Sequence, residues 1–240
     1  MFFFTASVLL TLLALPPSAA YAHDEVIYFS VMSGASLPGS YTNVENVGGS
    51  FEPGTTADDL DLENSLLYGA KAGIYSKSGI LGLETEVFSA NHDINSQTRT
   101  FYEPTFGPFQ QTQNGEARVT TWALNVVARI PINDNLTAHV AAGPAMFFSK
   151  LSLANEQSQS KSQAGLNTQL GLSYILSRQL SVFGEWKFNH ARIKYPSKGT
   201  TEGFEADYNP HAVVVGLSYT FDAPLPWRSP ITLRKLFGRE

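Results

Sequence analysis

The most informative stretch of this chain is LLYGAKAGIYSKSGILGLETEVF, residues Leu66–Phe88. Apolar side chains alternate with small or charged ones, and a period of two places alternate residues on opposite faces of a strand. The polar stretch Ser76–Gly79 is typical of a tight turn between two such strands. The segment therefore predicts an antiparallel hairpin with one apolar face and one face that carries Lys71, Glu84 and Glu86.

The same alternation recurs along the rest of the chain and predicts eight strands. They lie at Val26–Gly34, Leu66–Tyr75, Ile80–His92, Ala117–Ile130, Leu136–Ser149, Gln163–Leu176, Leu180–Arg192 and His211–Phe221. No segment of comparable length has the period of an amphipathic helix.

The connections between these strands alternate strictly in length. Tight turns are expected at Ser76–Gly79, Pro131–Asn135 and Ser177–Gln179, and long polar loops at Ala35–Ser65, Asp93–Glu116, Lys150–Ser162 and Ile193–Pro210. This order places every short turn at one end of the sheet and every long loop at the other, as in outer-membrane barrels. The predicted fold is all-β, an eight-stranded antiparallel up-and-down transmembrane β-barrel.

Composition excludes several other classes. The 240 residues include no cysteine, so a disulfide scaffold, a thiolate metal site and a cysteine nucleophile are ruled out. A formal net charge of −5 argues against nucleic-acid binding. Only 15% of residues are charged and 12% are aromatic, while a mean hydropathy of −0.09 excludes a helical membrane protein.

The first 22 residues have the pattern of a secretory signal peptide. An apolar core, Val8–Leu15, precedes the cleavage pattern Ala20-Tyr21-Ala22, so we expect a mature chain that begins at His23. No Lys or Arg precedes the core, which leaves a membrane anchor as a weaker alternative. The expected organisation is a signal peptide at 1–22, a barrel at 23–221 and a periplasmic tail at 222–240, in a protein exported to the outer membrane.

Pairing across the first hairpin predicts what the polar face contains. A turn centred on Lys77–Ser78 predicts Lys71 opposite Glu84, and Gly69 opposite Glu86. Every second residue of a strand lies on the same face, and following this alternation around the sheet gives the residues of the polar face. They are Lys71, Glu84, Glu86, Asn125, Arg129, His139, Asn167, Gln169, Glu185 and Lys187. In a membrane barrel this face lines the lumen, where we expect ion pairs among Lys71, Glu84, Glu86, Arg129, Glu185 and Lys187. In a soluble periplasmic barrel for a lipophilic ligand it would face water.

Aromatic residues on the apolar face favour the membrane barrel. One group is expected toward the long-loop end: Tyr68, Trp122, Phe148, Trp186 and Phe188. A second is expected toward the short-turn end: Phe29, Tyr174, Tyr219 and Phe221. Two aromatic girdles mark the two membrane interfaces of such barrels. Small residues on the polar face would make room inside an eight-stranded barrel for charged side chains.

Several segments resemble a known family. LLYGAKAGIYSKSGILGLETEVF, NLTAHVAAGPAMFF, LGLSYILSRQLSVFGEWKF and the closing VVVGLSYTF resemble the outer-membrane β-barrel domain family, which includes opacity-type porins and the transmembrane domain of OmpA. The resemblance spans roughly His23 to Phe221 and implies a surface antigen, an adhesin or a membrane-stabilising protein. It also implies that Tyr219 and Phe221 form a signal for the outer-membrane assembly machinery, although a 19-residue tail follows here.

Basic residues on the outward face gather beyond the upper aromatic group. By parity Arg118, Lys150, Arg192 and Lys194 share this face, with Arg118 and Lys150 on adjacent strands. Lipopolysaccharide phosphates lie at this level, and Arg and Lys bind phosphate through charge-assisted hydrogen bonds. We expect a lipopolysaccharide contact there.

Catalytic and metal sites are not expected. His190 lies near the outer rim, where lipid A deacylases carry His-x-Ser, but position 192 is Arg. The acidic stretch from Asp58 to Glu63 lacks the spacing and the glycine of a calcium loop. We therefore predict no catalytic residue, no metal and no cofactor.

Taken together, these features predict a monomeric outer-membrane barrel with a structural or surface-interaction role in envelope integrity, adhesion or antigen display. Its expected partners are outer-membrane lipids with lipopolysaccharide, the assembly machinery, and a host or surface ligand that the long loops would bind. Eight strands exclude a wide pore but leave a small conductance open. A lipid A-modifying enzyme and a soluble periplasmic binding barrel are the alternatives.

Overall fold

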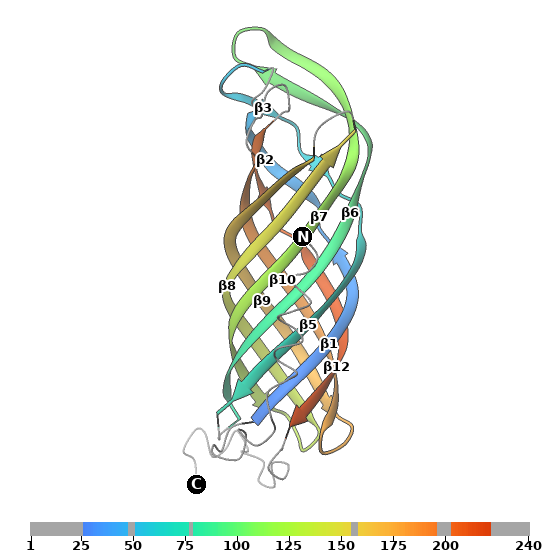
Figure 1. Ribbon diagram of the computed structural model, residues 1–240, viewed down its shortest axis with the longest axis vertical. Helices are drawn as coiled ribbons and strands as arrows, with labels where there is room; N and C mark the ends of the chain where they lie inside the picture. The colour runs from blue at the N-terminus through green and yellow to red at the C-terminus, as the bar shows by residue number, and fades with distance from the viewer. Residues whose placement is uncertain (1–25, 48–50, 77–78, 155–157, 196–202, 222–240) are drawn as a thin grey trace.

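The computed structural model describes residues 26–47, 51–76, 79–154, 158–195 and 203–221 (Figure 1). These ranges contain β-strands and no helix. The described residues therefore include no helix that could cross a membrane. The strands are β1 (Val26–Leu37), β2 (Ser40–Val47), β3 (Thr55–Ala57), β4 (Leu60–Asp61), β5 (Ser65–Tyr75), β6 (Leu81–Glu103), β7 (Gly107–Pro131), β8 (Leu136–Leu153), β9 (Gln159–Ile175), β10 (Leu180–Tyr195), β11 (Phe204–Tyr208) and β12 (His211–Phe221). The expected signal peptide and C-terminal tail lie outside the described residues.

Eight of these strands close into a ring. Each strand pairs antiparallel with its neighbours in the order β1, β5, β6, β7, β8, β9, β10 and β12. The ring closes where β12 pairs with β1, from Ile27 opposite Phe221 to Leu37 opposite His211. The predicted eight-stranded antiparallel barrel is confirmed, and Figure 1 shows its strongly tilted strands.

The prediction of long polar loops was wrong for much of their length. β6 and β7 continue as one hairpin to Glu103 and Gly107, and the ring is extended further by β2, β3, β4 and β11. Inward apolar side chains such as Ile94 and Phe101 hold this hairpin in register. We call the part of the sheet beyond His92 and Ala117, together with β2, β3, β4 and β11, the outer extension (Figure 1).

The predicted register of the first hairpin was also wrong, by two residues. Lys71 lies opposite Glu86, and Gly73 lies opposite Glu84. Pairing stops at Tyr75 and Gly82, which moves the centre of the turn one residue further along the chain. A slip of two residues keeps every side chain on its face, because side chains alternate with a period of two.

The two faces of the sheet exchange character along the strands. In the ring, outward side chains of β7 are apolar: Trp122, Leu124 and Val126 are 47–58% exposed. Above them on the same strand Arg118 points outward and Ala117 inward. We call the zone with apolar outward side chains the apolar belt. Seven of the nine expected girdle residues are exposed on it, namely Tyr68, Trp122, Phe148, Trp186, Tyr174, Tyr219 and Phe221, whereas Phe29 and Phe188 are half-buried.

Candidate functional site

The interior of the apolar belt holds a buried network of charges. Lys187 is fully buried on β10 and contacts Glu86 Oε2 at 2.6 Å and Glu185 Oε2 at 3.1 Å through its Nζ. It also donates a hydrogen bond to Gln169 Oε1. A charge removed from water in this way is tolerable only when it is paired and hydrogen-bonded.

A second lysine completes the network from the opposite wall. Lys71 Nζ lies 3.2 Å from Glu84 Oε2 and also pairs with Glu185 Oε1. The pair Lys71–Glu84 therefore forms diagonally, although the two residues are not direct cross-strand partners. Tyr28 donates its hydroxyl hydrogen to Glu84 Oε2, and Lys71 lies over the ring of Phe183.

Amide side chains satisfy the remaining carboxylate oxygens. Asn167 and Asn125 both donate to Glu86 Oε1, at 2.6 and 3.2 Å. Gln169 donates to Glu84 Oε1 at 2.6 Å. The network thus joins β1, β5, β6, β7, β9 and β10 across the lumen, so it braces strands that are not neighbours.

The remaining expected lumen residues, His139 and Arg129, also lie inside. His139 Nε2 lies 2.8 Å from Glu185 Oε1, which adds β8 to the network. Arg129 packs over the ring of Tyr75 at 4.3 Å, and among the described residues it does not form the ion pair expected from the sequence. Gly171 leaves space for the contact between His139 and Glu185, because a Cβ at position 171 would lie 2.6 Å from both Glu185 Cγ and His139 Nε2.

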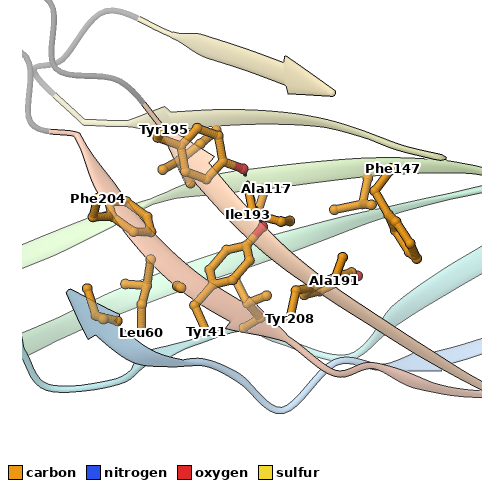
Figure 2. Close-up of a cluster of buried hydrophobic side chains, with 14 of the residues drawn as sticks. Tyr41, Leu60, Ala117, Phe147, Ala191, Ile193, Tyr195, Phe204 and Tyr208 are labelled. Carbon is orange, nitrogen blue, oxygen red and sulfur yellow. Dashed lines mark hydrogen bonds between the residues drawn. The ribbon is translucent and has the colours of Figure 1, made fainter. Parts of the chain in front are cut away.

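The interior of the outer extension is apolar instead (Figure 2). Tyr41 and Leu60 are completely buried there, and the cluster continues into the ring, where Phe147 is completely buried on β8. The full cluster is Tyr41, Val44, Val47, Leu60, Leu62, Ile94, Phe101, Ala117, Val119, Ala123, Ala145, Phe147, Leu151, Leu153, Ala191, Ile193, Tyr195, Phe204, Ala206 and Tyr208. Burial raises the pKa of Tyr41 and Tyr208 above the ordinary range. A second buried apolar cluster, which includes Met32, Leu67, Phe88, Phe183 and Val214, lies within the ring. The interior therefore combines charge pairs with apolar groups in the ring and is mainly apolar in the outer extension.

His92 lies at the boundary between these two interiors and is fully buried. Its Nδ1 lies 2.9 Å from the Glu63 carbonyl oxygen and 3.1 Å from Ser65 Oγ. Because a carbonyl only accepts, Nδ1 carries the hydrogen. Nε2 faces Ser36 Oγ at 3.5 Å and the Tyr208 hydroxyl at 3.4 Å. Burial lowers the pKa of His92.

Asp58 fastens the long β6–β7 hairpin to the rest of the outer extension. Its Oδ2 accepts the backbone N–H of Thr100 at 2.9 Å, and its Oδ1 accepts the Tyr102 hydroxyl at 3.3 Å. The hydrogen bond from Thr100 lowers the pKa of Asp58. Arg99, buried beneath, donates to the Asp58 carbonyl oxygen.

The four rim cations all point outward but fall into two kinds. Arg192 contacts Glu45 at 2.7 Å and two further carboxylates at 3.5 Å, and Lys194 contacts Glu205 at 2.9 Å. The hydrogen bond to Glu45 raises the pKa of Arg192, and Lys194 lowers that of Glu205. Arg118 and Lys150 lie directly opposite each other on β7 and β8.

Carboxylates of the acidic stretch are engaged in separate hydrogen bonds. Asp58 is hydrogen-bonded as above, Asp61 accepts the Ser40 hydroxyl at 2.6 Å, and Glu63 accepts the Asn95 amide at 2.7 Å. Among the described residues, no three His, Asp or Glu side chains are grouped closely enough to hold an ion.

Tyr28 and His92 are among the interior residues that sequence reasoning missed. Tyr28 lies on an expected strand, and extending the parity to that strand would have placed it with the lumen residues. His92 ended an expected strand, but its partners come from β1, β5 and β11, which no short-range pattern connects.

A closed antiparallel ring with an apolar outside and paired charges inside defines a β-barrel of the membrane-spanning class. The chain belongs to the outer membrane protein beta-barrel domain family, whose model matches residues 5–221. No curated protein sequence matches it.

Solved structures of small outer-membrane barrels are similar to this chain. Neisserial surface protein A is 10% identical, with a TM-score of 0.49 and coverage of 82% of this chain and 97% of that one. Ail of Yersinia pestis, in complex with the heparin analogue sucrose octasulfate, is 15% identical, with a TM-score of 0.42 and coverage of 81% and 99%. The N-terminal barrel of Pseudomonas aeruginosa OprF is 11% identical, with a TM-score of 0.44 and coverage of 83% and 98%.

Proposed function

We propose that this protein is a sealed barrel of the bacterial outer membrane with a structural or surface-interaction role: envelope integrity, adhesion or antigen display. It does not act as a wide pore. The ring anchors the chain in the bilayer, and the outer extension is a rigid platform that stands above the bilayer on the cell surface. The surface ligand would bind this platform.

The observation that carries the proposal is the exchange of faces along the strands. On β6, Leu83 and Val87 point outward within the belt, whereas Ile94 and Phe101 are buried within the outer extension. Apolar outward groups suit lipid, and an apolar interior with polar outward groups suits water. The same strand therefore has an outward face suited to lipid in the belt and an outward face suited to water in the outer extension. This fits a barrel that extends well above the membrane surface.

Filling of the interior argues for a scaffold rather than a conduit. In the belt Lys187 pairs with Glu86, and Lys71 with Glu185, across the lumen. In the outer extension Tyr41 and Leu60 are completely buried. An eight-stranded barrel has an interior that side chains can fill, and here they do so in both zones.

The proposal includes the partners that an outer-membrane location requires. Tyr219 and Phe221 end the last strand as exposed aromatics, which fits a recognition signal for the assembly machinery. A chain truncated after Phe221 should therefore still insert and migrate differently in gels before and after heating. Failure to insert would assign the signal to residues 222–240.

Surface display is tested on intact cells. The variant replaces residues 95–114, the upper part of the β6–β7 hairpin, with an Asn-Gly turn. We expect it to fractionate with the outer membrane and keep heat-modifiable migration, but to lose the surface phenotype of the parent, measured as cell aggregation and adhesion to coated surfaces. Protease treatment of intact cells should cleave the parent only in the outer extension.

Planar-bilayer recordings test the sealed interior. The purified protein should give no steady open-channel current, and a stable large conductance would contradict the proposal. Recovery of the mature protein in the soluble periplasmic fraction would instead support the alternative of a soluble lipophilic-ligand barrel.

A further inference from the structure

Two outward cations of the rim lack the carboxylate partners that the other two possess. Arg118 and Lys150 are direct cross-strand neighbours, and like charges in that position repel each other. Within the described residues neither forms a salt bridge, whereas Arg192 and Lys194 both do. The Arg118–Lys150 pair is therefore the rim position that gains most from an external anion.

The height of this pair on the barrel indicates where the anion would come from. On β8, Lys150 lies two residues above the girdle residue Phe148, whose cross-strand partner is Thr120. Two residues are one step of the outward face, because side chains alternate along a strand. Aromatic girdles mark the level of the lipid headgroups, so both cations lie just above the outer-leaflet surface.

Neighbouring side chains position one cation and leave donors available. Asn91 Oδ1 accepts a hydrogen bond from Arg118 Nε at 3.4 Å, which steadies the guanidinium. Within the described residues, the terminal nitrogens of Arg118 and Nζ of Lys150 donate to no protein acceptor. Asp93 and Glu116 lie opposite each other one step further up, on the aqueous side of the pair. The free donors therefore remain on the lipid side of these acids.

We propose that Arg118 and Lys150 form a binding site for a phosphate group of lipopolysaccharide on the outer leaflet. The guanidinium fork and the ammonium point charge supply complementary donors for phosphate oxygens. Arg192 and Lys194 are not part of the site, because Glu45 and Glu205 already neutralise them. This inference narrows the four-residue contact that the sequence predicted to two residues, and it rests on the proposed placement in the outer membrane.

The test compares two matched double variants of the full chain. Arg118→Gln with Lys150→Gln removes the proposed site, and Arg192→Gln with Lys194→Gln removes the same charge from the same rim. Each protein is extracted from outer membranes in mild detergent, and lipopolysaccharide per barrel is measured by mass spectrometry. We expect at least a fivefold loss for the first variant and less than a twofold loss for the second. Equal losses, or none in the first, would overturn the site.

A second measurement uses the unmodified protein, so it does not depend on the folding of a variant. The protein is titrated in detergent with lipid A, with lipid A from which both phosphates have been removed, and with inorganic phosphate. We expect saturable binding of lipid A at least fivefold tighter than of the dephosphorylated form, and no binding of free phosphate at matched concentration. Equal binding of the two lipids would overturn the site, and tight binding of inorganic phosphate would assign it to a soluble anion.

The same samples separate this inference from the proposed function. Heat-modifiable migration and outer-membrane fractionation report on the barrel itself and should be unchanged in both double variants. A parent that fails these two assays contradicts the proposed function, whereas a parent that passes them without phosphate-dependent lipid A binding contradicts only the site.

Discussion

The belt interior and the outer extension interior are two different solutions to filling one barrel. In the belt, Lys187 and Glu86 are buried and paired, and outward groups such as Leu124 face lipid. In the outer extension, Tyr41 and Leu60 are buried and charges such as Lys194 point outward. The apolar outward groups of the belt contact lipid, so their burial does not hold the strands together, and the interior ion pairs and hydrogen bonds link strands across the lumen. In the outer extension, burial of apolar side chains in the interior stabilises the sheet through the hydrophobic effect.

The largest effect should come from the belt interior. Lys187→Met leaves Glu86 and Glu185 with less positive charge, and an uncompensated buried charge costs about 3–5 kcal/mol. The whole ring should lose stability in urea titrations in lipid vesicles. Lys194→Met, a change of the same kind on the outer extension, should cost under about 1 kcal/mol. Similar losses for both would mean that burial inside the belt does not make the Lys187 pairs more important than an exposed pair.

Leucine truncations sharpen the same comparison. Leu60 lies in the outer extension and Leu67 in the ring, and each is at most 1% exposed. Replacing either with Ala should cost about 2–4 kcal/mol through lost burial and a cavity. Leu60→Ala should expose only the outer extension to protease and keep heat-modifiable migration, while Leu67→Ala should lower the unfolding midpoint of the ring. Loss of the ring on Leu60→Ala would mean that the two zones unfold as one unit.

Acid should loosen the boundary between the two zones. Burial lowers the pKa of His92, so folding favours the neutral ring and unfolding lets it take up a proton. The resulting stability is complete above about pH 6.5 and falls as pH drops below, by at most about 1.4 kcal/mol per unit. The protection factors for amide hydrogen exchange in β2 and β11 should fall between pH 7.5 and 5, once the pH dependence of the intrinsic exchange rate has been removed. His92→Gln should remove this pH dependence, and exposed His190→Gln should not.

The smallest effect concerns the attachment of the hairpin. Asp58→Ala removes the acceptors of the Thr100 N–H and the Tyr102 hydroxyl, so amide exchange in the hairpin should rise by roughly two- to fivefold. Since the pKa of Asp58 is lowered, the attachment should persist at neutral pH and weaken only as the carboxylate is protonated in acid. Asp59→Ala is the matched control on the neighbouring exposed carboxylate. An equal rise there would deny Asp58 its role.

The strands of the ring could be predicted from the sequence because the period of two is local. The register at Lys71 could not, since it depends on where the turn ends, and Gly82 rather than the expected Ile80 is the first residue of β6 that pairs with β5. The polar composition of the stretch from Asp93 to Glu116 predicts a loop, whereas the structure has a hairpin there. Its few inward groups, among them Phe101, become informative only once the neighbouring strands are in place.

The candidate sites could likewise be predicted only in part: the sequence indicates the face on which each residue lies, but not all of its partners. Parity places Lys71, Glu84 and Lys187 on one face, and their contacts in the structure follow from that placement. The alternation of side chains also predicts that Arg192 points outward. It does not predict that Arg192 pairs with Glu45, which lies 147 residues earlier in the chain. Which rim cations form ion pairs with distant strands can therefore be read only from the three-dimensional structure.

Closure of the ring has a consequence for the order of events in assembly. β1 is among the earliest described segments and β12 is the last, yet each requires the other as a hydrogen-bonding partner. Until Phe221 has been exported, β1 presents an open edge that would invite pairing with other chains. Contacts this distant along the chain also form slowly. The unfinished protein must therefore be held by something else throughout synthesis, and it gains its final stability in one late step.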